Sequence, residues 1–238
     1  MDKLGIIGGM GPLATQLLYR EITEKTDASC DQEHIDMIIL SHAKMPDRTE
    51  AIRSGHTDEI KKLLLDDAKF LEKNGMGAIA IPCNTSHYFW EYLQENIHIP
   101  IINMVRETVR TVVAKGYKKI GVLATDGTVF TGIYKKECER AGAEYFAPDR
   151  EHQALVMKII YDQIKKGLPG SDEDFAKIDR HLRENGCDAA ILACTELSCY
   201  AKQGKISDFY TDALDILCEK SILACGAKLK KSEDSSNG

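Results

Sequence analysis

A chain of 238 residues is long enough for one large or two small domains with hydrophobic cores of their own. The 43% hydrophobic and 29% charged residues are ordinary for a globular protein, and a net charge of −6 with both signs interspersed argues against nucleic-acid and anionic-membrane partners. No apolar run approaches the roughly 20 residues of a membrane helix, and the first residues are too few and too rich in Gly for a signal peptide. We therefore expect a cytoplasmic protein.

Apolar runs typical of strands alternate with helical patterns along the whole chain. The expected strands are 3–7, 37–40, the runs that end at 83 and 194, 100–104, 119–125, 145–148 and 209–212. The expected helices are 12–22, 58–73, 86–93, 105–115, 129–141, 155–166, 172–184 and 213–223. This alternation predicts an α/β fold with mostly parallel sheets.

Two short stretches of the chain look like copies of each other. Residues 74–85 (NGMGAIAIPCNT) and 185–196 (NGCDAAILACTE) each have an Asn-Gly turn, an apolar run and then a Cys, at the same offset of 111 residues (185 − 74 and 194 − 83). Asn-Gly after a helical stretch is typical of a helix C-cap, and the apolar run that follows is typical of a buried strand. Cys83 and Cys194 are therefore expected at the carboxyl ends of strands, where open α/β sheets bind their ligands.

The opening strand recurs as well, because Gly5 is matched by Gly121 at an offset of 116 residues, which one loop insertion reconciles with 111. We therefore expect two pseudo-symmetric domains, each a mostly parallel sheet flanked by helices. The first would comprise 1–97 plus 210–238 and the second 98–209. The active site is expected in the cleft between the two domains, where both strand-end Cys would meet.

Two thiols that face one cleft have a clear chemical use. One can remove a proton from a carbon while the other returns a proton from the opposite face, which is general acid–base catalysis with paired groups. A thiolate just before a helix is stabilised by the partial positive charge of the helix N-terminus. Small polar residues with donors for an anion follow each Cys: Asn84, Thr85, Thr195 and Glu196. The alternative is that duplication left two buried Cys without chemistry, since most Cys in such a chain are small buried hydrophobes.

Other patterns define rival interpretations. Gly9-x-Gly11-x-x-Ala14 fits the dinucleotide fingerprint of a dehydrogenase, but Pro12 removes a backbone donor and the next strand ends in Ser-His instead of an acidic residue. His87, one helical turn after Cys83, could tune that thiol or only pack. The other His show no metal-ligand spacing and no C-x-x-C pair exists, so no metal site is predicted.

Four motifs together resemble the aspartate/glutamate racemase family. They are GGMGPLAT at 8–15, PDRT at 46–49, CNTSH at 83–87 and CTEL at 194–197, and the match spans nearly the whole chain. The resemblance implies an amino-acid racemase that uses neither pyridoxal phosphate nor any other cofactor, with a cleft between two α/β domains. The family usually has Gly where this chain has Ala193, a methyl group that leaves the thiol in place.

By this resemblance Cys83 and Cys194 are the two acid/base thiols. Arg48 would receive a side-chain carboxylate and Lys165 would be a second cationic clamp, with its register against Lys166 open by one residue. The other residues expected to bind substrate are Met10 through its backbone, Asn84 and Thr85 at the α-carboxylate, Thr128, Thr195 and Glu196. Glu196 could equally be a first-turn acid of the following helix.

The predicted reaction interconverts the L- and D-forms of an acidic amino acid, aspartate first and glutamate next, because two cations suit two carboxylates. Alternatives are a two-thiol isomerase or racemase of the hydantoin or maleate type, and a small-anion binding module without catalysis. The expected partners are a small-molecule substrate and a second copy of the chain in a homodimer, with no nucleic acid and no membrane.

Overall fold

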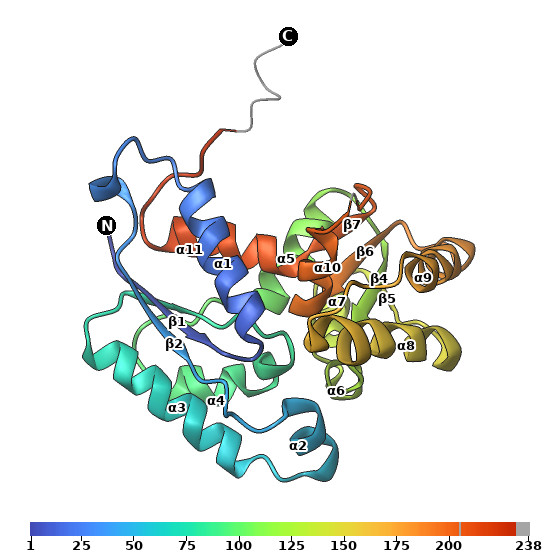
Figure 1. The fold of residues 1–238 in the computed structure, drawn as a ribbon, viewed down its shortest axis with the longest axis horizontal. Coiled ribbons are helices and arrows are strands. Elements are labelled where there is room, and N and C mark those ends of the chain that lie inside the picture. The colour runs from blue at the N-terminus through green and yellow to red at the C-terminus, as the bar shows by residue number, and fades with distance from the viewer. Residues whose placement is uncertain (205, 232–238) are drawn as a thin grey trace.

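The computed structural model describes residues 1–204 and 206–231, and in them two parallel sheets are flanked by helices (Figure 1). The first sheet has the order β2-β1-β3, from β1 (Leu4–Gly8), β2 (Met37–Ser41) and β3 (Ala78–Ala80). The second has the order β5-β4-β6-β7, from β4 (Lys119–Ala124), β5 (Glu144–Phe146), β6 (Ala189–Ala193) and β7 (Tyr210–Asp212). All of these strand pairs are parallel, so the predicted α/β fold is confirmed.

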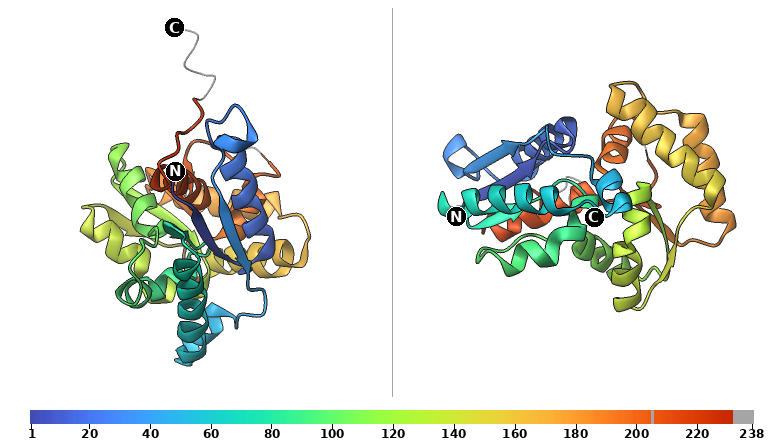
Figure 2. Two further views of the ribbon diagram at one scale, coloured as in Figure 1. Left: turned by 90° about the vertical axis from the view of Figure 1, so that its left-hand side faces the viewer. Right: turned by 90° about the horizontal axis from the view of Figure 1, so that it is seen from below.

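Helices follow most strands, as the sequence predicted. They are α1 (Pro12–Lys25), α2 (Arg48–Ser54), α3 (Asp58–Lys73), α4 (Trp90–Glu95), α5 (Met104–Ala114), α6 (Asp126–Thr131), α7 (Ile133–Arg140), α8 (Arg150–Met157), α9 (Asp172–Glu184), α10 (Thr195–Ala201) and α11 (Ala213–Ala224). The short 3-10 turns are η1 (Asp31–Glu33), η2 (Thr85–Phe89) and η4 (Ile164–Lys166), and η3 (Lys158–Gln163) is a π-helical turn. Helix α3 lies at one end of the molecule and α8 and α9 at the other (Figures 1 and 2).

The central strands β1 and β6 are buried along their whole length. This burial requires cover on both faces, which explains why their sequences are continuous apolar runs and not alternating patterns. One hydrophobic cluster joins the two sheets, because it contains Leu4 of β1, Val109 of α5, Val122 of β4 and Leu217 of α11. The helices α5 and α11 therefore hold the two sheets together.

Four predicted elements differ from the structure. The expected helix 129–141 is interrupted at Gly132, which separates α6 from α7, and the expected helix 86–93 begins as the 3-10 turn η2 before α4. The expected strand 100–104 is reduced to one bridge between Ile101 and Ile79, because the Asn103 side chain accepts a hydrogen bond of 2.9 Å from the backbone N–H of Arg106 and starts α5. The expected helix 155–166 is divided into the end of α8, the π-helical turn η3 and the 3-10 turn η4. Its apolar residues face one core, but their spacing does not reveal the local change in hydrogen bonding.

The predicted division into 1–97 plus 210–238 and 98–209 stays a prediction, and its last junction assigns β7 to the first domain. The strand β7 pairs with β6 in the second sheet, while α11, directly after it, contacts α1 of the first half. The chain therefore returns to the first half after β7 and not before it. Residues 232–238 of the predicted first domain lie outside the described residues.

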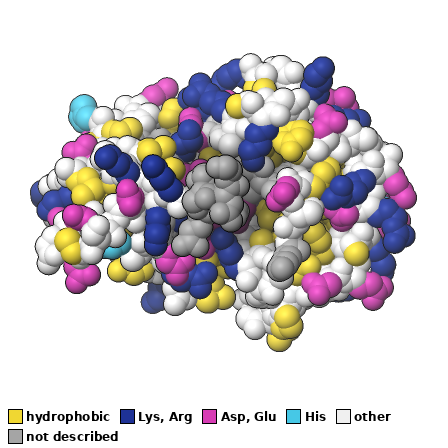
Figure 3. All heavy atoms as spheres, turned by 90° about the horizontal axis from the view of Figure 1, so that it is seen from above, with side chains coloured by type: hydrophobic (Ala, Val, Ile, Leu, Met, Phe, Trp, Pro, Cys, Tyr) yellow, Lys and Arg dark blue, Asp and Glu magenta, His cyan; other side chains and the backbone are white. Residues whose placement is uncertain are grey.

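Among the described residues, none of the helices combines the length and hydrophobicity needed to cross a membrane. On the face that Figure 3 shows, Lys and Arg side chains are interspersed with Asp and Glu and do not form a patch of one sign. This distribution agrees with the mixed charge pattern of the sequence.

The two halves touch closely where α2 meets α6. Gly127 of α6 faces Thr49 of α2, and a Cβ atom at Gly127 would lie 2.7 Å from the Thr49 Cα. Hydroxyl groups bond across the same junction, with Thr49 Oγ1 3.3 Å and Thr85 Oγ1 3.1 Å from Thr125 Oγ1. A side chain at residue 127 would therefore separate the two halves.

Gly127→Ala is expected to lower the free energy of unfolding by about 1–3 kcal/mol, because the added methyl group meets backbone that cannot move away without opening the interface. Urea denaturation followed by circular dichroism measures this change. The matched control is Gly204→Ala, where a Cβ would meet nothing within 4 Å. Equal stability of the two variants would contradict the close contact between α2 and α6.

Candidate active site

Cys83 and Cys194 line the same cavity between the two halves. Cys83 lies three residues after β3, Cys194 follows β6 directly, and both residues are 6% exposed. The cavity has a volume of about 20 Å³. Its other lining residues are Met10, Asp47, Arg48, Thr49, Asn84, Thr85, Thr125, Tyr161, Lys165, Thr195 and Glu196. The structure therefore brings together all of the predicted site residues except Thr128.

Cys194 shares a proton with an acid. Its sulfur donates to Glu196 Oε2 at 2.9 Å, and both residues are buried. Burial raises the pKa of the Cys194 thiol well above its usual value, and the Glu196 carboxylate raises it further, while the positive charge of Lys165 opposes them. The thiol is therefore held in its protonated form.

Lys165, and not Lys166, faces the cavity. Lys166 pairs with Asp162 at 2.9 Å on the surface, where its side chain is 60% exposed. Burial lowers the pKa of Lys165, but the negative charges near it, Glu196 first, outweigh burial and raise that pKa above its usual value. Its Nζ also lies 4.1 Å from the centre of the Tyr161 ring. Lys165 is therefore a firmly positive group beside the Cys194–Glu196 pair.

Arg48, from the first half, supplies a second positive group to the cavity. It begins α2, and its Nη1 donates to the carbonyl oxygen of Pro46 at 2.9 Å while Nη2 lies 3.4 Å from the carbonyl oxygen of Met10. Its buried Nε has no hydrogen-bond partner among the described residues. Burial lowers the pKa of Arg48, but the negative charges of a Cys83 thiolate and Asp47 outweigh it and raise that pKa. Arg48 thus has a free donor beside Cys83.

Asn84 offers another free donor. The hydroxyl of Tyr134, on α7 in the second half, donates to Asn84 Oδ1 and fixes the orientation of the amide. The buried Nδ2 of Asn84 is then left without a partner among the described residues. An unpaired buried N–H is costly, and one that lines a cavity suits an anionic oxygen.

Thr85 lines the cavity, whereas the predicted ligand Thr128 lies behind it. The two hydroxyl oxygens are 2.8 Å apart, and Thr128 is only 2% exposed. Thr125, which the sequence analysis did not single out, takes the place of Thr128 at the cavity. Thr128 therefore supports the position of Thr85, an arrangement that depends on packing between residues 43 positions apart.

His87 contacts the backbone of the Cys83 loop and not the thiol. The backbone N–H of Met104 donates to His87 Nε2 at 3.1 Å, so the ring proton lies on Nδ1, which donates to the Cys83 carbonyl oxygen at 2.9 Å. Burial lowers the pKa of His87, which agrees with a neutral ring. Of the two roles left open by the sequence, the contacts favour packing and positioning of the loop.

Tyr161 and Asp47 also line the candidate site, and the sequence analysis did not single them out. Tyr161, in the π-helical turn η3, donates to Asp47 Oδ2 at 3.1 Å, and Lys165 Nζ lies 3.9 Å from the same oxygen. These contacts join the second half to the loop before α2. Asp47 lies in the PDRT motif already noted, but Tyr161 is 114 residues away from it and carries no local signal.

A larger cavity of about 430 Å³ adjoins the first and shares five of its lining residues: Met10, Asp47, Arg48, Lys165 and Glu196. The Gly-rich turn after β1 forms part of its wall. Gly9 has a φ angle of 87°, and a Cβ there would lie 2.5 Å from the backbone of His42. Gly9 therefore allows the turn to pack closely against the backbone of His42 beside the candidate site.

Comparisons with known proteins agree with this geometry. A family model described as Asp/Glu/Hydantoin racemase matches residues 7–210. The chain is 30% identical over 199 residues to the broad specificity amino-acid racemase RacX of Bacillus subtilis (strain 168), a match that covers 82% of this chain and 86% of the relative. It is also 30% identical over 209 residues to a glutamate racemase of Aquifex pyrophilus, over 85% of this chain and 74% of that one.

A solved structure is similar over almost the whole length. Picrophilus torridus aspartate racemase superposes with a TM-score of 0.80 at 30% sequence identity, and the match covers 96% of each chain. The family model, the racemase sequences and the solved aspartate racemase structure each match most of the chain. The protein therefore belongs to the Asp/Glu/hydantoin racemase family of isomerases.

Proposed function

We propose that the enzyme interconverts the L- and D-forms of an acidic amino acid, aspartate first and glutamate next, by proton transfer between Cys83 and Cys194. The observation that carries this proposal is that the two thiols, from the ends of strands in different sheets, line one cavity. Two groups on opposite sides of one carbon can invert it, since one removes the α-proton while the other supplies a proton to the opposite face.

The two thiols have different neighbours in the cavity, so we assign them different roles in one direction of the reaction. Cys194 is protonated and bonded to Glu196, so it is poised to act as the acid. Cys83 lines the same cavity beside Arg48, and in this direction it is the group that removes the α-proton. After one turnover the two thiols have exchanged roles, and the enzyme is ready for the other enantiomer.

Two carboxylates of the substrate have two sets of partners. The free Nδ2 of Asn84, with Thr85 and Thr195 beside it, suits the α-carboxylate. Arg48, with its free Nε, and Lys165 suit the side-chain carboxylate, because a guanidinium can bind both oxygens of a carboxylate. Binding of a dicarboxylate would offset both positive charges, so these cations favour an acidic substrate over a neutral one.

The proposed reaction needs no pyridoxal phosphate, so the site itself has to stabilise the carbanion. Preorganised donors in a dry cavity can supply this stabilisation. The cavity of about 20 Å³ is smaller than an amino acid. The two halves would therefore open to admit the substrate from the adjoining cavity of about 430 Å³ and close again around it.

Hydantoin- or maleate-type substrates and a binding module without catalysis are the alternatives. Incubation with each L-amino acid in D2O, followed by chiral analysis, separates them from an amino-acid racemase. No deuterium incorporation and no D-isomer from any amino acid would contradict the proposal. The expected homodimer and cytoplasmic location stay predictions, the first of which light scattering on the purified protein measures.

Replacement of either thiol tests the two-base mechanism. Cys83→Ser and Cys194→Ser should each lower racemisation by roughly 10²- to 10⁴-fold, because a hydroxyl is a much weaker acid and base at neutral pH. Each variant should still exchange the α-proton of the one enantiomer that the remaining thiol deprotonates. Deuterium exchange of both pure enantiomers, followed by nuclear magnetic resonance, measures this asymmetry.

The matched control for these variants is Cys187→Ser, which replaces a buried thiol outside the cavity and should keep full activity. If both cavity variants exchange deuterium into the two enantiomers at the wild-type rate, the two-thiol mechanism is wrong.

Glu196→Gln should change the pH dependence of one direction of the reaction. The base form of Cys194 exists above its pKa, so kcat/KM for the enantiomer that Cys194 deprotonates rises with pH through that pKa. Removing the Glu196 charge lowers the pKa of Cys194 and moves this rise to lower pH. Lys165→Met removes a positive charge that opposes Glu196, so it raises the pKa of Cys194 and moves the rise to higher pH.

The matched control is Lys166→Met, at a lysine that points to the surface, which should leave the pH profile unchanged. Shifts in the same direction for Glu196→Gln and Lys165→Met would contradict this electrostatic description.

Arg48→Met should raise KM for aspartate by roughly 10- to 100-fold, because a charged hydrogen bond to the side-chain carboxylate is lost. Arg48→Lys should recover only part of that loss, since Lys has no bidentate fork. Arg53→Met, on the exposed face of the same helix, is the matched control. Steady-state kinetics with aspartate and with alanine show whether Arg48 binds the side-chain carboxylate, which alanine lacks. An equal rise in KM for both substrates would place Arg48 outside the side-chain subsite.

A further inference from the structure

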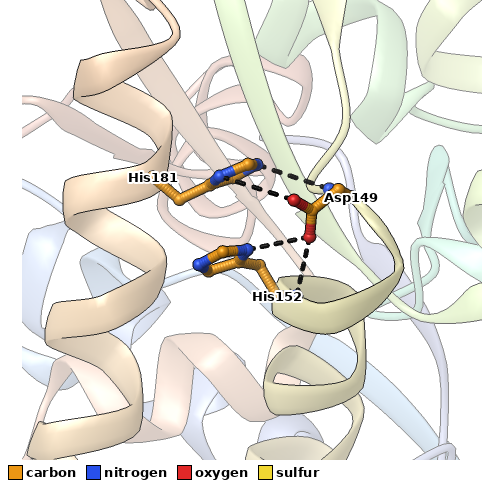
Figure 4. A group of neighbouring side chains, drawn as sticks. All are labelled: Asp149, His152 and His181. Atoms are coloured by element: carbon orange, nitrogen blue, oxygen red, sulfur yellow. Dashed lines mark hydrogen bonds and ion pairs between the residues drawn. The ribbon is translucent and has the colours of Figure 1, made fainter.

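Three side chains that the proposed reaction does not use lie together on the helices of the second sheet (Figure 4). Asp149 caps the start of α8, His152 lies in the first turn of α8, and His181 lies in the last turn of α9. Each offers an atom that can bind a metal ion, and these atoms all lie within 4.8 Å of one another. None of the three residues lines the cavity between Cys83 and Cys194.

The distances within this cluster are close to those of a metal site. Asp149 Oδ1 lies 2.8 Å from His152 Nδ1, and Oδ2 of the same carboxylate lies 3.8 Å from His181 Nδ1. A tetrahedral ion with bonds of about 2.1 Å holds its ligands about 3.4 Å apart, between these two values. The two imidazole rings are stacked, with centroids 3.9 Å apart and planes at 11°. Rotation of the His152 ring, which is more exposed than the His181 ring, would direct one nitrogen of each ring towards the same ion position.

His181 lacks a strong hydrogen bond although its side chain is only 12% exposed. Its Nε2 lies 3.4 Å from the backbone nitrogen of Asp149, and its Nδ1 lies 3.4 Å from the Asn185 amide nitrogen. Both distances exceed the usual hydrogen-bond length of about 2.9–3.0 Å. The Phe146 ring packs against the imidazole, with centroids 5.7 Å apart, and limits its movement. The ring is therefore held only by long contacts, and an ion bound at Nδ1, which lies 3.8 Å from Asp149 Oδ2, would take the place of the proton on that nitrogen.

The donor set selects the class of ion. The backbone N–H of His152 donates to Asp149 Oδ1 at 3.0 Å and fixes this carboxylate beside the two imidazole rings. Two imidazole nitrogens and one carboxylate oxygen suit Zn²⁺ and its late first-row neighbours, whereas Mg²⁺ and Ca²⁺ prefer oxygen alone. Because all three residues have exposed surface, a water molecule could complete a tetrahedron.

We propose that Asp149, His152 and His181 form a binding site for a zinc-class divalent cation with one water ligand. The ion would join the start of α8 to the end of α9. Helix α8 continues through η3 to Tyr161 and Lys165, and α9 is followed by the strand that ends at Cys194. Bound metal would thus stabilise the half of the enzyme that holds the Cys194 side of the active site.

Titration of the metal-free, full-length protein with Co²⁺ tests this site by a readout other than activity. The expected spectrum has the visible d–d bands of a tetrahedral nitrogen–oxygen site, saturates at one ion per chain, and lacks the near-ultraviolet charge-transfer band of thiolate ligands. This last feature matters because the chain has eight Cys that could bind cobalt elsewhere. Added Zn²⁺ should displace the Co²⁺ and raise the melting temperature.

Two variants and one control locate the ion. Asp149→Asn keeps a good helix cap but removes the charge, and His181→Gln removes the most buried ligand; each should weaken Co²⁺ binding at least tenfold. His98→Gln, a His whose side chain is 97% exposed and lies outside the cluster, should bind as the wild type does. If His181→Gln loses its native circular dichroism, His152→Gln, at a more exposed position, serves with the same threshold. Absent visible bands, a thiolate band alone, or unchanged affinity in Asp149→Asn would overturn the proposal.

Discussion

The close contact between the helices α2 and α6, which follow strands of the two sheets, is the constraint on which the site depends. Gly127 leaves no room for a methyl group against Thr49, and threonine hydroxyls bond across the junction beside it. Since every strand pair is parallel, each sheet collects the ends of its strands at one edge. Contact between α2 and α6 brings these two sets of strand ends together, so that the residues after β3 and β6 line one small cavity. The positions of both thiols therefore follow from backbone packing and not from their own contacts.

Charge balance inside this cavity is the second constraint. A buried thiol and a buried carboxylate, Cys194 and Glu196, share one proton at 2.9 Å. Two negative charges there would be costly without a counter-ion, and Lys165 supplies one. A dicarboxylic substrate would bring further negative charge to the same place. Arg48 lines the same cavity, and its guanidinium, with one unpaired N–H among the described residues, can bind a carboxylate and balance its negative charge.

Local patterns in the sequence predicted well those elements that local forces define. The expected helices 58–73 and 172–184 have the same bounds as α3 and α9, because an apolar stripe and an Asn-Gly C-cap mark each of them. The segment 155–166 has a similar stripe but contains the π-helical turn η3. That turn presents Tyr161 to Asp47, more than one hundred residues away, and helical periodicity alone cannot show such a partner.

The sequence by itself determined the parallel α/β class, the paired strand ends with Cys83 and Cys194, and the motifs that resemble the racemase family. These features are local or repeated, so they can be read from spacing and residue type. Only the tertiary structure decided that Lys165 and not Lys166 faces the cavity, that Thr128 lies behind Thr85, and that two distant His share Asp149. The physical reason is that such neighbours are set by how helices and sheets pack, and packing joins residues with no common local pattern.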